Sequence, residues 1–288
     1  MGSLVVEGVP QSCEEDASQM SRQPIGVFDS GVGGLTVLKQ LSLRMPQERL
    51  IYLGDTARLP YGTKSKETVV KYSMRNAAFL VEKGVKCLVV ACNTASSLAL
   101  EELRRDFSMP VIGVIHPGAR KAASTSRVRR VGVIGTLATV RSRAYEEAIE
   151  SYGADIEVTS VPCPLFVALA EEGWVQDEVT YRVAERYLGP LQDKRIDVLV
   201  LGCTHYPLLK SVISEVMGED VVLVDSAEEA ANEVAASMGE TGLTADHEDA
   251  AQLRSPTICL TDRSLHFLEL GEKILELPLP EVEYVDLG

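Results

Sequence analysis

Short apolar runs alternate with stretches of helical periodicity along most of the chain. The apolar runs are rich in Val, Ile and Leu, and the stretches between them carry apolar residues at intervals of three and four. The runs predict buried strands at 25–28, 50–53, 87–91, 111–115, 131–134, 156–159, 198–202, 221–224 and 257–260. The periodic stretches predict helices at 35–43, 66–83, 95–106, 142–152, 177–192 and 227–238. This alternation favours an α/β fold with mainly parallel sheets and helices on both faces.

One pattern occurs twice: an apolar run ends in a small residue, a cysteine and then polar side chains. CLVVACNTAS places Cys92 at the end of one run, and VLVLGCTHYP places Cys203 at the end of another. In open α/β sheets, ligands bind beyond the carboxyl ends of the strands, where helix N-termini present free N–H groups. The repeat therefore predicts two similar three-layer α/β domains that face each other across a central cleft, each with one thiol.

The spacing of the two thiols suggests where the domains begin and end. The first 23 residues do not resemble a signal peptide, because no basic residue precedes their short apolar stretch and acidic residues follow it. The expected division is 1–23 for a mobile extension, 24–115 plus 225–288 for the first domain, which carries Cys92, and 116–224 for the second domain, which carries Cys203.

Composition and charge narrow the class of protein. The 288 residues are 45% hydrophobic and 24% charged, which is typical of a soluble globular protein. A net charge of -14 argues against a nucleic-acid footprint. No apolar run approaches the roughly 20 residues of a membrane span. Six cysteines without an export signal indicate free thiols and a cytoplasmic location.

A glycine-rich loop follows the first predicted strand, in IGVFDSGVGGLTVL. The dinucleotide-binding spacing fails, because Thr36 stands where the third glycine is required. The phosphate-binding loop motif fails in YGTKS, because Thr63 stands where lysine is required. No nucleotide cofactor is therefore expected, although the glycines allow the backbone to approach a small anion closely. Asp29 and Ser30 would lie level with Cys92 if their strands are neighbours.

The two thiols have other interpretations. Free cysteines are often buried apolar filler. Cys92, Cys203 and His205 do not have a usual zinc-ligand spacing, so no metal is expected. A single nucleophilic cysteine paired with His205 for acyl transfer would leave the second thiol without a role. The cysteines without polar neighbours at a strand end are expected to be structural or, for the first, to lie in the extension: Cys87, Cys163, Cys259 and Cys13.

Two equivalent thiols across a cleft suit the inversion of a carbon centre. One group removes a proton from one face of the carbon, and the other delivers a proton to the opposite face. A thiol with an ordinary pKa near 8.5 serves in either role. No lysine lies in a setting that suggests pyridoxal phosphate, so hydrogen bonds to the substrate and a dry cleft must stabilise the carbanion.

Four segments, FDSGVGGL, GDTARLPYG, VVACNTAS and VLGCTHYPLL, resemble the signature segments of bacterial glutamate racemases. VIGTLATVRSRAY, CPLFVALAEEG and LVDSAEEAA extend the resemblance over about residues 24–270. It implies a cofactor-independent isomerase that interconverts L- and D-glutamate and supplies D-glutamate for peptidoglycan. The alternatives are a racemase of aspartate or another acidic amino acid, and a non-catalytic amino-acid-binding module. The sequence leaves open whether the chain forms a homodimer.

The resemblance also implies the site residues. Cys92 and Cys203 would be the two acid/base thiols, with Asp29 assisting Cys92, His205 assisting Cys203, and Glu171 as a further helper on the side of the second domain. The implied substrate contacts are Asp29, Ser30, Tyr61, Gly62, Asn93, Thr94, Thr136, Thr204 and His205.

Two positions qualify this assignment. Glu172 is adjacent to Glu171, which leaves the helper uncertain by one residue. His116 stands where many members of the family have glutamate, and it suggests a pH effect at the connection between the domains.

Overall fold

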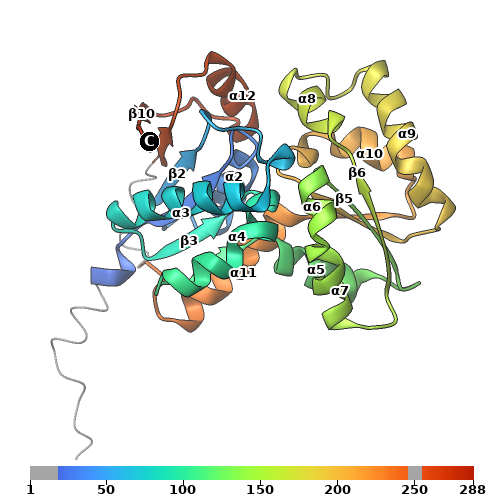
Figure 1. Cartoon of the computed structure of the whole chain (residues 1–288), viewed down its shortest axis with the longest axis horizontal. Coiled ribbons are helices and arrows are strands. Elements are labelled where there is room, and N and C mark those ends of the chain that lie inside the picture. Colours follow the sequence, from blue (N-terminus) through green and yellow to red (C-terminus); the bar gives the residue numbers. More distant parts are fainter. Residues whose placement is uncertain (1–18, 246–254) are drawn as a thin grey trace, which may run out of the picture.

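The structure is a computed structural model that describes residues 19–245 and 255–288. Its strands form two sheets, one of six strands and one of four, and all the strand pairs of the described residues are parallel. Helices pack on both faces of each sheet, and the two units stand side by side (Figure 1). The predicted α/β class, with two three-layer units and mainly parallel sheets, is confirmed.

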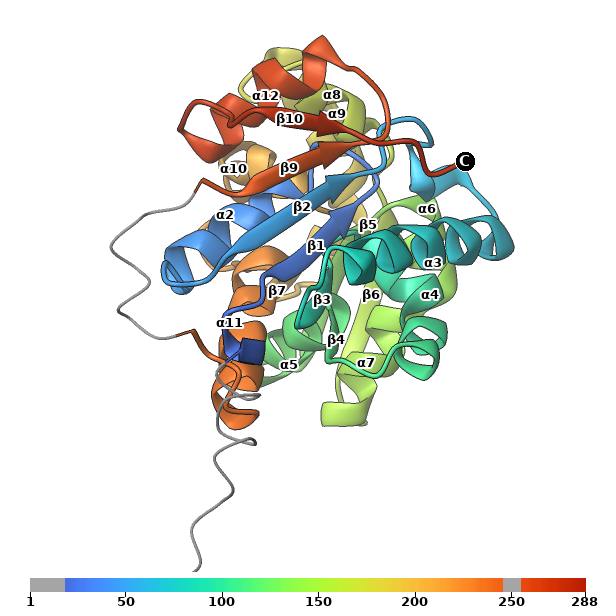
Figure 2. The ribbon, with the colours of Figure 1, turned by 90° about the vertical axis from the view of Figure 1, so that its left-hand side faces the viewer.

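The six-stranded sheet has the order β10-β9-β2-β1-β3-β4, and Figure 2 shows it edge to edge. Phe28 in its centre pairs with Leu53 on one side and Val90 on the other. Strands buried on both faces need continuous apolar sequence, which these runs supply. The strands are β1 (Ile25–Asp29), β2 (Leu50–Gly54), β3 (Cys87–Val90), β4 (Val111–Gly113), β9 (Thr257–Leu260) and β10 (Val282–Tyr284).

The four-stranded sheet has the order β6-β5-β7-β8. Its central strands are held in register by pairs such as Val133 with Val200 and Gly135 with Gly202. The strands are β5 (Arg130–Gly135), β6 (Glu157–Pro162), β7 (Val198–Gly202) and β8 (Val222–Asp225).

Four apolar clusters fill the spaces between sheets and helices. Two lie on opposite faces of the six-stranded sheet, and two on opposite faces of the four-stranded sheet. The first sheet is covered by α2 (Leu35–Arg44), α11 (Ser226–Glu240) and α12 (Leu265–Leu275) on one face, and by α3 (Lys66–Glu82) and α4 (Asn93–Asp106) on the other. The second is covered by α5 (Ile115–Thr125) and α7 (Ala144–Tyr152), and by α8 (Leu165–Glu171), α9 (Glu178–Asp193) and α10 (Lys210–Met217). The remaining elements are α6 (Leu137–Ser142), η1 (Tyr61–Thr63) and η2 (Tyr206–Leu209).

The chain passes between the two sheets twice. It leaves the first sheet after β4 and enters the second unit through α5, then returns from β8 into α11. The prediction that the strand at 111–115 includes Ile115 is wrong, because Ile115 begins α5. Pro117 lies in the first turn of that helix, where a missing N–H group is tolerated.

The chain is already anchored before the first strand. Residues 1–18 of the expected extension lie outside the described residues, but Ser21 is buried. Its carbonyl oxygen accepts a hydrogen bond from Lys86 Nζ at 2.5 Å. Lys86 also forms a fully buried ion pair with Glu48 and donates to the Leu243 carbonyl at 2.7 Å. Lys86 therefore joins its own segment to three others that are distant in the sequence, near the amino-terminal ends of the strands in the first sheet.

Candidate functional site

The two cysteines of the repeated pattern each lie just beyond the carboxyl end of a buried strand. Cys92 is separated from β3 by Ala91 and forms the N-cap of α4, and Cys203 directly follows β7 at the start of the turn into η2. Because β1 and β3 are paired neighbours, Asp29 and Cys92 leave the same edge of the first sheet. The expected level placement of Asp29, Ser30 and Cys92 is confirmed.

A cavity of about 670 Å³ is lined by both of these cysteines. Of the residues implied by the resemblance, its lining includes Ser30, Tyr61, Gly62, Cys92, Asn93, Thr94, Thr136, Glu171, Cys203, Thr204 and His205. Asp29 is fully buried and is absent from the lining. Residues contributed by both sheets therefore surround one space, with Asp29 behind its wall.

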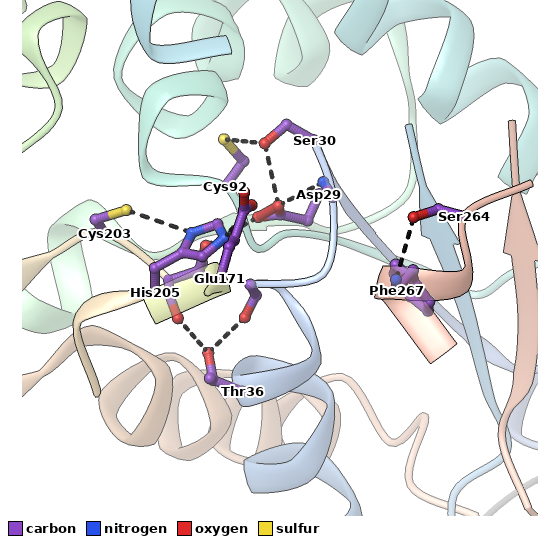
Figure 3. A network of polar contacts seen from close by, with 12 residues as sticks. Asp29, Ser30, Thr36, Cys92, Glu171, Cys203, His205, Ser264 and Phe267 are labelled. Atoms are coloured by element: carbon purple, nitrogen blue, oxygen red, sulfur yellow. Dashed lines mark hydrogen bonds and ion pairs between the residues drawn. The ribbon is translucent and has the colours of Figure 1, made fainter. Parts of the chain in front are cut away.

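Cys92 is linked to the Asp29 carboxylate through a hydroxyl (Figure 3). Its Sγ donates to Ser30 Oγ at 3.9 Å, and Ser30 Oγ donates to Asp29 Oδ2 at 3.2 Å. Burial raises the pKa of the Cys92 thiol, and the charge of Asp29 adds to this, while the Ala95 N–H partly offsets it. The first thiol is therefore held in its neutral, protonated form.

Cys203 has a different partner. Its Sγ lies 3.8 Å from His205 Nδ1, and His205 Nε2 lies 3.0 Å from Glu171 Oε1. Burial lowers the pKa of His205, but hydrogen bonds to Cys203 and Glu171 outweigh it and raise the pKa to about 10. The ring is then a cation that donates one N–H to the sulfur and the other to the carboxylate.

Glu171 and Glu172 differ in their surroundings. Glu171 is half-buried, and although burial raises its pKa, the hydrogen bond and charge of His205 give a net lowering. The Glu172 side chain is exposed. Of the two carboxylates, Glu171 therefore lies in contact with the His205 ring.

Polar side chains from both units meet at the far wall of the cavity. Thr94 Oγ1 lies 2.9 Å from Thr136 Oγ1, which belongs to the turn after β5. The Asn93 Oδ1 atom accepts a hydrogen bond from Tyr145 OH at 2.7 Å, and Asn93 Nδ2 donates to Ser226 Oγ at 3.4 Å. Tyr145 was not predicted, because its place on α7 gives no local sign of an approach to Asn93.

A buried network fixes the loop that carries Tyr61 and Gly62. The Tyr61 hydroxyl donates to the Asp55 carboxylate and accepts from Asn76 Nδ2 at 3.0 Å. Thr261 Oγ1 donates to the other Asp55 oxygen at 2.9 Å. Asp55 therefore anchors this wall of the cavity through Tyr61.

One wall of the cavity was missed by the sequence reasoning. It consists of residues from β6, α8 and α9 and their connections: Pro162, Pro164, Val167, Ala168 and Tyr187. The apolar segment PLFVALA was the only local sign of α8, and a helix of seven residues is too short for its periodicity to be distinctive.

The other described cysteines are not among the cavity-lining residues, although Cys163 stands between Pro162 and Pro164, which are. Cys87, Cys163 and Cys259 are buried with free thiols and do not line it, and Cys13 lies outside the described residues. Within the described residues no group of His, Cys, Asp and Glu is arranged to hold a metal ion. No helix in the same part of the chain is long and apolar enough to cross a membrane.

His116 lies outside this cavity, in the first turn of α5 where the chain passes between the sheets. Burial and the charge of Arg104 lower its pKa, while Glu233 acts in the opposite direction.

The geometry supports proton transfer on both sides of a small substrate. Two thiols line one cavity, one of them linked to a carboxylate and the other beside an imidazolium. Hydroxyl and amide groups between them provide donors and acceptors for a small polar molecule.

Comparison with known proteins gives consistent relatives. The sequence profile of the Asp/Glu/Hydantoin racemase family matches residues 35–234. The chain is 60% identical over 216 residues to a glutamate racemase of Geobacter metallireducens, covering 75% of this chain and 80% of that relative. It is 46% identical over 265 residues to a glutamate racemase of Chlorobium phaeobacteroides, covering 92% and 96%.

A solved structure of similar fold is the glutamate racemase of Francisella tularensis in complex with D-glutamate. It has a TM-score of 0.86 and 39% sequence identity, covering 93% of this chain and 98% of that chain.

Proposed function

This chain belongs to the Asp/Glu/Hydantoin racemase family and is an amino-acid racemase that acts on glutamate, and we propose that Cys92 and Cys203 are its two acid/base groups. In each direction one sulfur removes the α-proton and the other delivers a proton to the opposite face. The single observation that carries the proposal is the cavity lined by both thiols, each beyond the end of a strand of a different sheet.

The two thiols have different neighbours. Burial and the charge of Asp29 raise the pKa of Cys92 and keep it protonated. Cys203 lies beside the His205 cation. In the proposal Cys92 delivers a proton in one direction of the reaction while Cys203 removes the α-proton, and the two roles are exchanged in the reverse direction.

Asp29, His205 and Glu171 take the supporting roles in this proposal. Asp29 lies one hydroxyl away from Cys92 and orients its proton through Ser30. His205 faces the Cys203 sulfur, and Glu171 stabilises the charge on His205. The negative charge of Asp29 disfavours a thiolate at Cys92 and so keeps a proton on that sulfur for delivery.

The substrate would be held by the polar groups between the thiols: Ser30, Tyr61, Gly62, Asn93, Thr94, Thr136, Thr204 and His205, with Asp29 behind them. Free N–H groups at the start of α4 favour a carboxylate next to Asn93 and Thr94. No pyridoxal phosphate, metal ion or nucleotide enters the proposal. In the proposal, hydrogen-bond donors fixed around the cavity stabilise the developing charge, because preorganised donors do so more strongly than bulk solvent.

The remaining assignments belong to the same proposal. D-Glutamate is a component of peptidoglycan, so the product would be used in cell-wall synthesis. A cytoplasmic location is supported by the free thiols of the described cysteines. We keep the domain limits 24–115 plus 225–288 and 116–224, since the first sheet includes β9 and β10 and the second does not. Sedimentation velocity decides between a monomer and a homodimer.

The test of the activity is to incubate the purified chain with L-glutamate in deuterated water without any added cofactor. Optical rotation should decay to zero, and the α-proton signal should disappear with it. If both signals persist, the assignment as an enzyme is wrong. Turnover of L-aspartate alone would replace glutamate by the alternative substrate. Full turnover after removal of one thiol would favour a different chemistry. Absence of turnover in the intact chain would favour a binding module.

A further inference from the structure

The glycine loop after β1 contacts the second unit at the turn that holds Cys203. Thr36 Oγ1 lies 2.9 Å from the Gly33 carbonyl oxygen and 3.1 Å from the Thr204 carbonyl oxygen (Figure 3). Thr36 is buried in the first turn of α2, and its bond to Thr204 joins residues that are 168 positions apart. One hydroxyl proton is therefore shared between a carbonyl of the first unit and a carbonyl beside Cys203.

The same turn is held at a second point. Thr204 Oγ1 donates to Asp29 Oδ1 at 3.3 Å, so Thr204 contacts the first unit through both its side chain and its carbonyl. Thr204 stands directly between Cys203 and His205 in the chain. Fixing its peptide groups therefore fixes the direction of the residues on either side of it.

Gly33 makes this contact sterically possible. A Cβ atom added at Gly33 would lie 2.5 Å from Thr204 Oγ1 and 2.6 Å from His205 Nδ1. Both distances are shorter than any real contact of a Cβ atom, and both target atoms are buried and held by other bonds. The His205 nitrogen at this point is the one that faces the Cys203 sulfur. A side chain at position 33 would therefore displace the partner of the second thiol.

We propose that Thr36 and Gly33 form a positioning element that sets the direction of Cys203 and His205 against the first unit. The inference rests on the proposed function, because it assigns the element to one of the two thiols. It also explains why the loop lacks the third glycine of a dinucleotide-binding motif: position 36 carries a hydroxyl that reaches across to the other unit. Both are positioning residues, since they act on the reaction through Thr204 and His205.

The test compares variants of Thr36 that keep or remove the donor. Thr36→Val keeps the shape and removes the hydroxyl, and Thr36→Ser keeps the hydroxyl. Ser42→Ala is the matched control, because Ser42 Oγ donates to the Leu38 carbonyl at 3.0 Å in the same helix, without a contact across the units. We expect kcat/KM to fall about 10- to 100-fold in Thr36→Val, as for a small misplacement of a reacting group. Thr36→Ser and Ser42→Ala should keep most of the activity.

A readout specific to one thiol separates positioning from simple destabilisation. The two enantiomers have equal free energies, so kcat/KM must fall equally in both directions. The deuterium isotope effects measured with α-deuterated L- and D-glutamate need not change equally. Glu171→Gln, which changes the direct partner of His205, identifies the enantiomer whose proton Cys203 removes. In Thr36→Val the isotope effect should rise for that same enantiomer and fall for the other.

Gly33→Ala provides a second, independent variant. It should lower kcat/KM at least as strongly as Thr36→Val and with the same asymmetry between the enantiomers. Gly189→Ala is its control, since no atom lies within 4 Å of a Cβ added there. If the wild type is active and Thr36→Val has unchanged kinetics, the positioning inference is wrong while the proposed function stands. The same conclusion follows if Thr36→Val lowers the unfolding temperature but changes the isotope effects of the two enantiomers equally. A wild type without racemisation overturns the proposed function first.

Discussion

His205 and Glu171 form a hydrogen-bonded ion pair in which Nε2 lies 3.0 Å from Oε1. The two residues come from different elements, one from the turn after β7 and the other from the end of α8. The pair leaves the opposite ring nitrogen facing Cys203. A short helix that was not predicted from the sequence thus supplies the counter-charge for one half of the site.

Replacing Glu171 by Gln should weaken the pH dependence of stability. In the folded protein the pKa of His205 is raised from 6.5 to about 10. A raised pKa contributes stability that is complete below pH 6.5 and is lost as the pH rises towards 10. Glu171→Gln removes part of the cause, so its free energy of unfolding should fall less than that of the wild type over this range. Urea denaturation at several pH values measures the difference. Parallel curves for the two proteins would contradict the assigned pair.

Removing either reacting thiol should abolish turnover without loss of the fold. Cys92→Ser and Cys203→Ser should each lower kcat by about 10²–10⁴, because a serine hydroxyl is a far weaker acid than a thiol. Cys163→Ser is the matched control, since Cys163 is fully buried and does not line the cavity. Polarimetry on all three variants, with circular dichroism as a check on folding, is the measurement. Equal losses in all three would remove the distinction between reacting and structural thiols.

Removing the Tyr61 hydroxyl should destabilise the protein and loosen the loop that lines the cavity. Tyr61→Phe leaves the buried Asp55 without one of its donors and Asn76 Nδ2 without its acceptor. An unsatisfied buried polar group costs about 1–3 kcal/mol. Chemical denaturation should show a loss of this size, and the KM for glutamate should rise. Tyr152→Phe, at an exposed tyrosine, should change neither value.

Lys86→Met should destabilise the fold while sparing the chemistry. The variant leaves Glu48 as a buried charge without its partner, and removes donors to the Ser21 and Leu243 carbonyls. Breaking a buried pair in this way costs about 3–5 kcal/mol. Lys83→Met, which breaks the exposed pair with Glu283, should cost no more than about 1 kcal/mol. Equal unfolding midpoints for the two variants would refute the anchoring role, and kcat of the folded fraction should stay unchanged in both.

The central strands of both sheets could be predicted because they are buried on both faces. Such strands must be almost wholly apolar, as in β1 and β7, and that makes them visible in sequence. β10 escaped prediction because it is a three-residue edge strand with a charged residue in its centre. In the described part of the chain β10 pairs with β9 on one side, so it is covered less than a central strand and requires little apolar sequence.

The cavity-lining residues could be listed from the resemblance, but their mutual contacts could not. Thr94 and Thr136 face each other across the units at 2.9 Å, and Thr36 reaches Thr204 at 3.1 Å. Contacts of this kind depend on how two separately formed sheets pack together. Local propensity and periodicity contain no information on that packing, and the same holds for the bond between Tyr145 and Asn93.

The order of the strands has a consequence for synthesis on the ribosome. Every strand of the four-stranded sheet lies between Arg130 and Asp225, so that sheet is complete when the chain has reached its return to the first unit. The six-stranded sheet needs β9 beside β2, a pairing that joins Ile51 to Thr257. It can be closed only when the last part of the chain has emerged. We therefore expect the half with Cys203 to assemble first during translation, and the cleft to become competent only at its end.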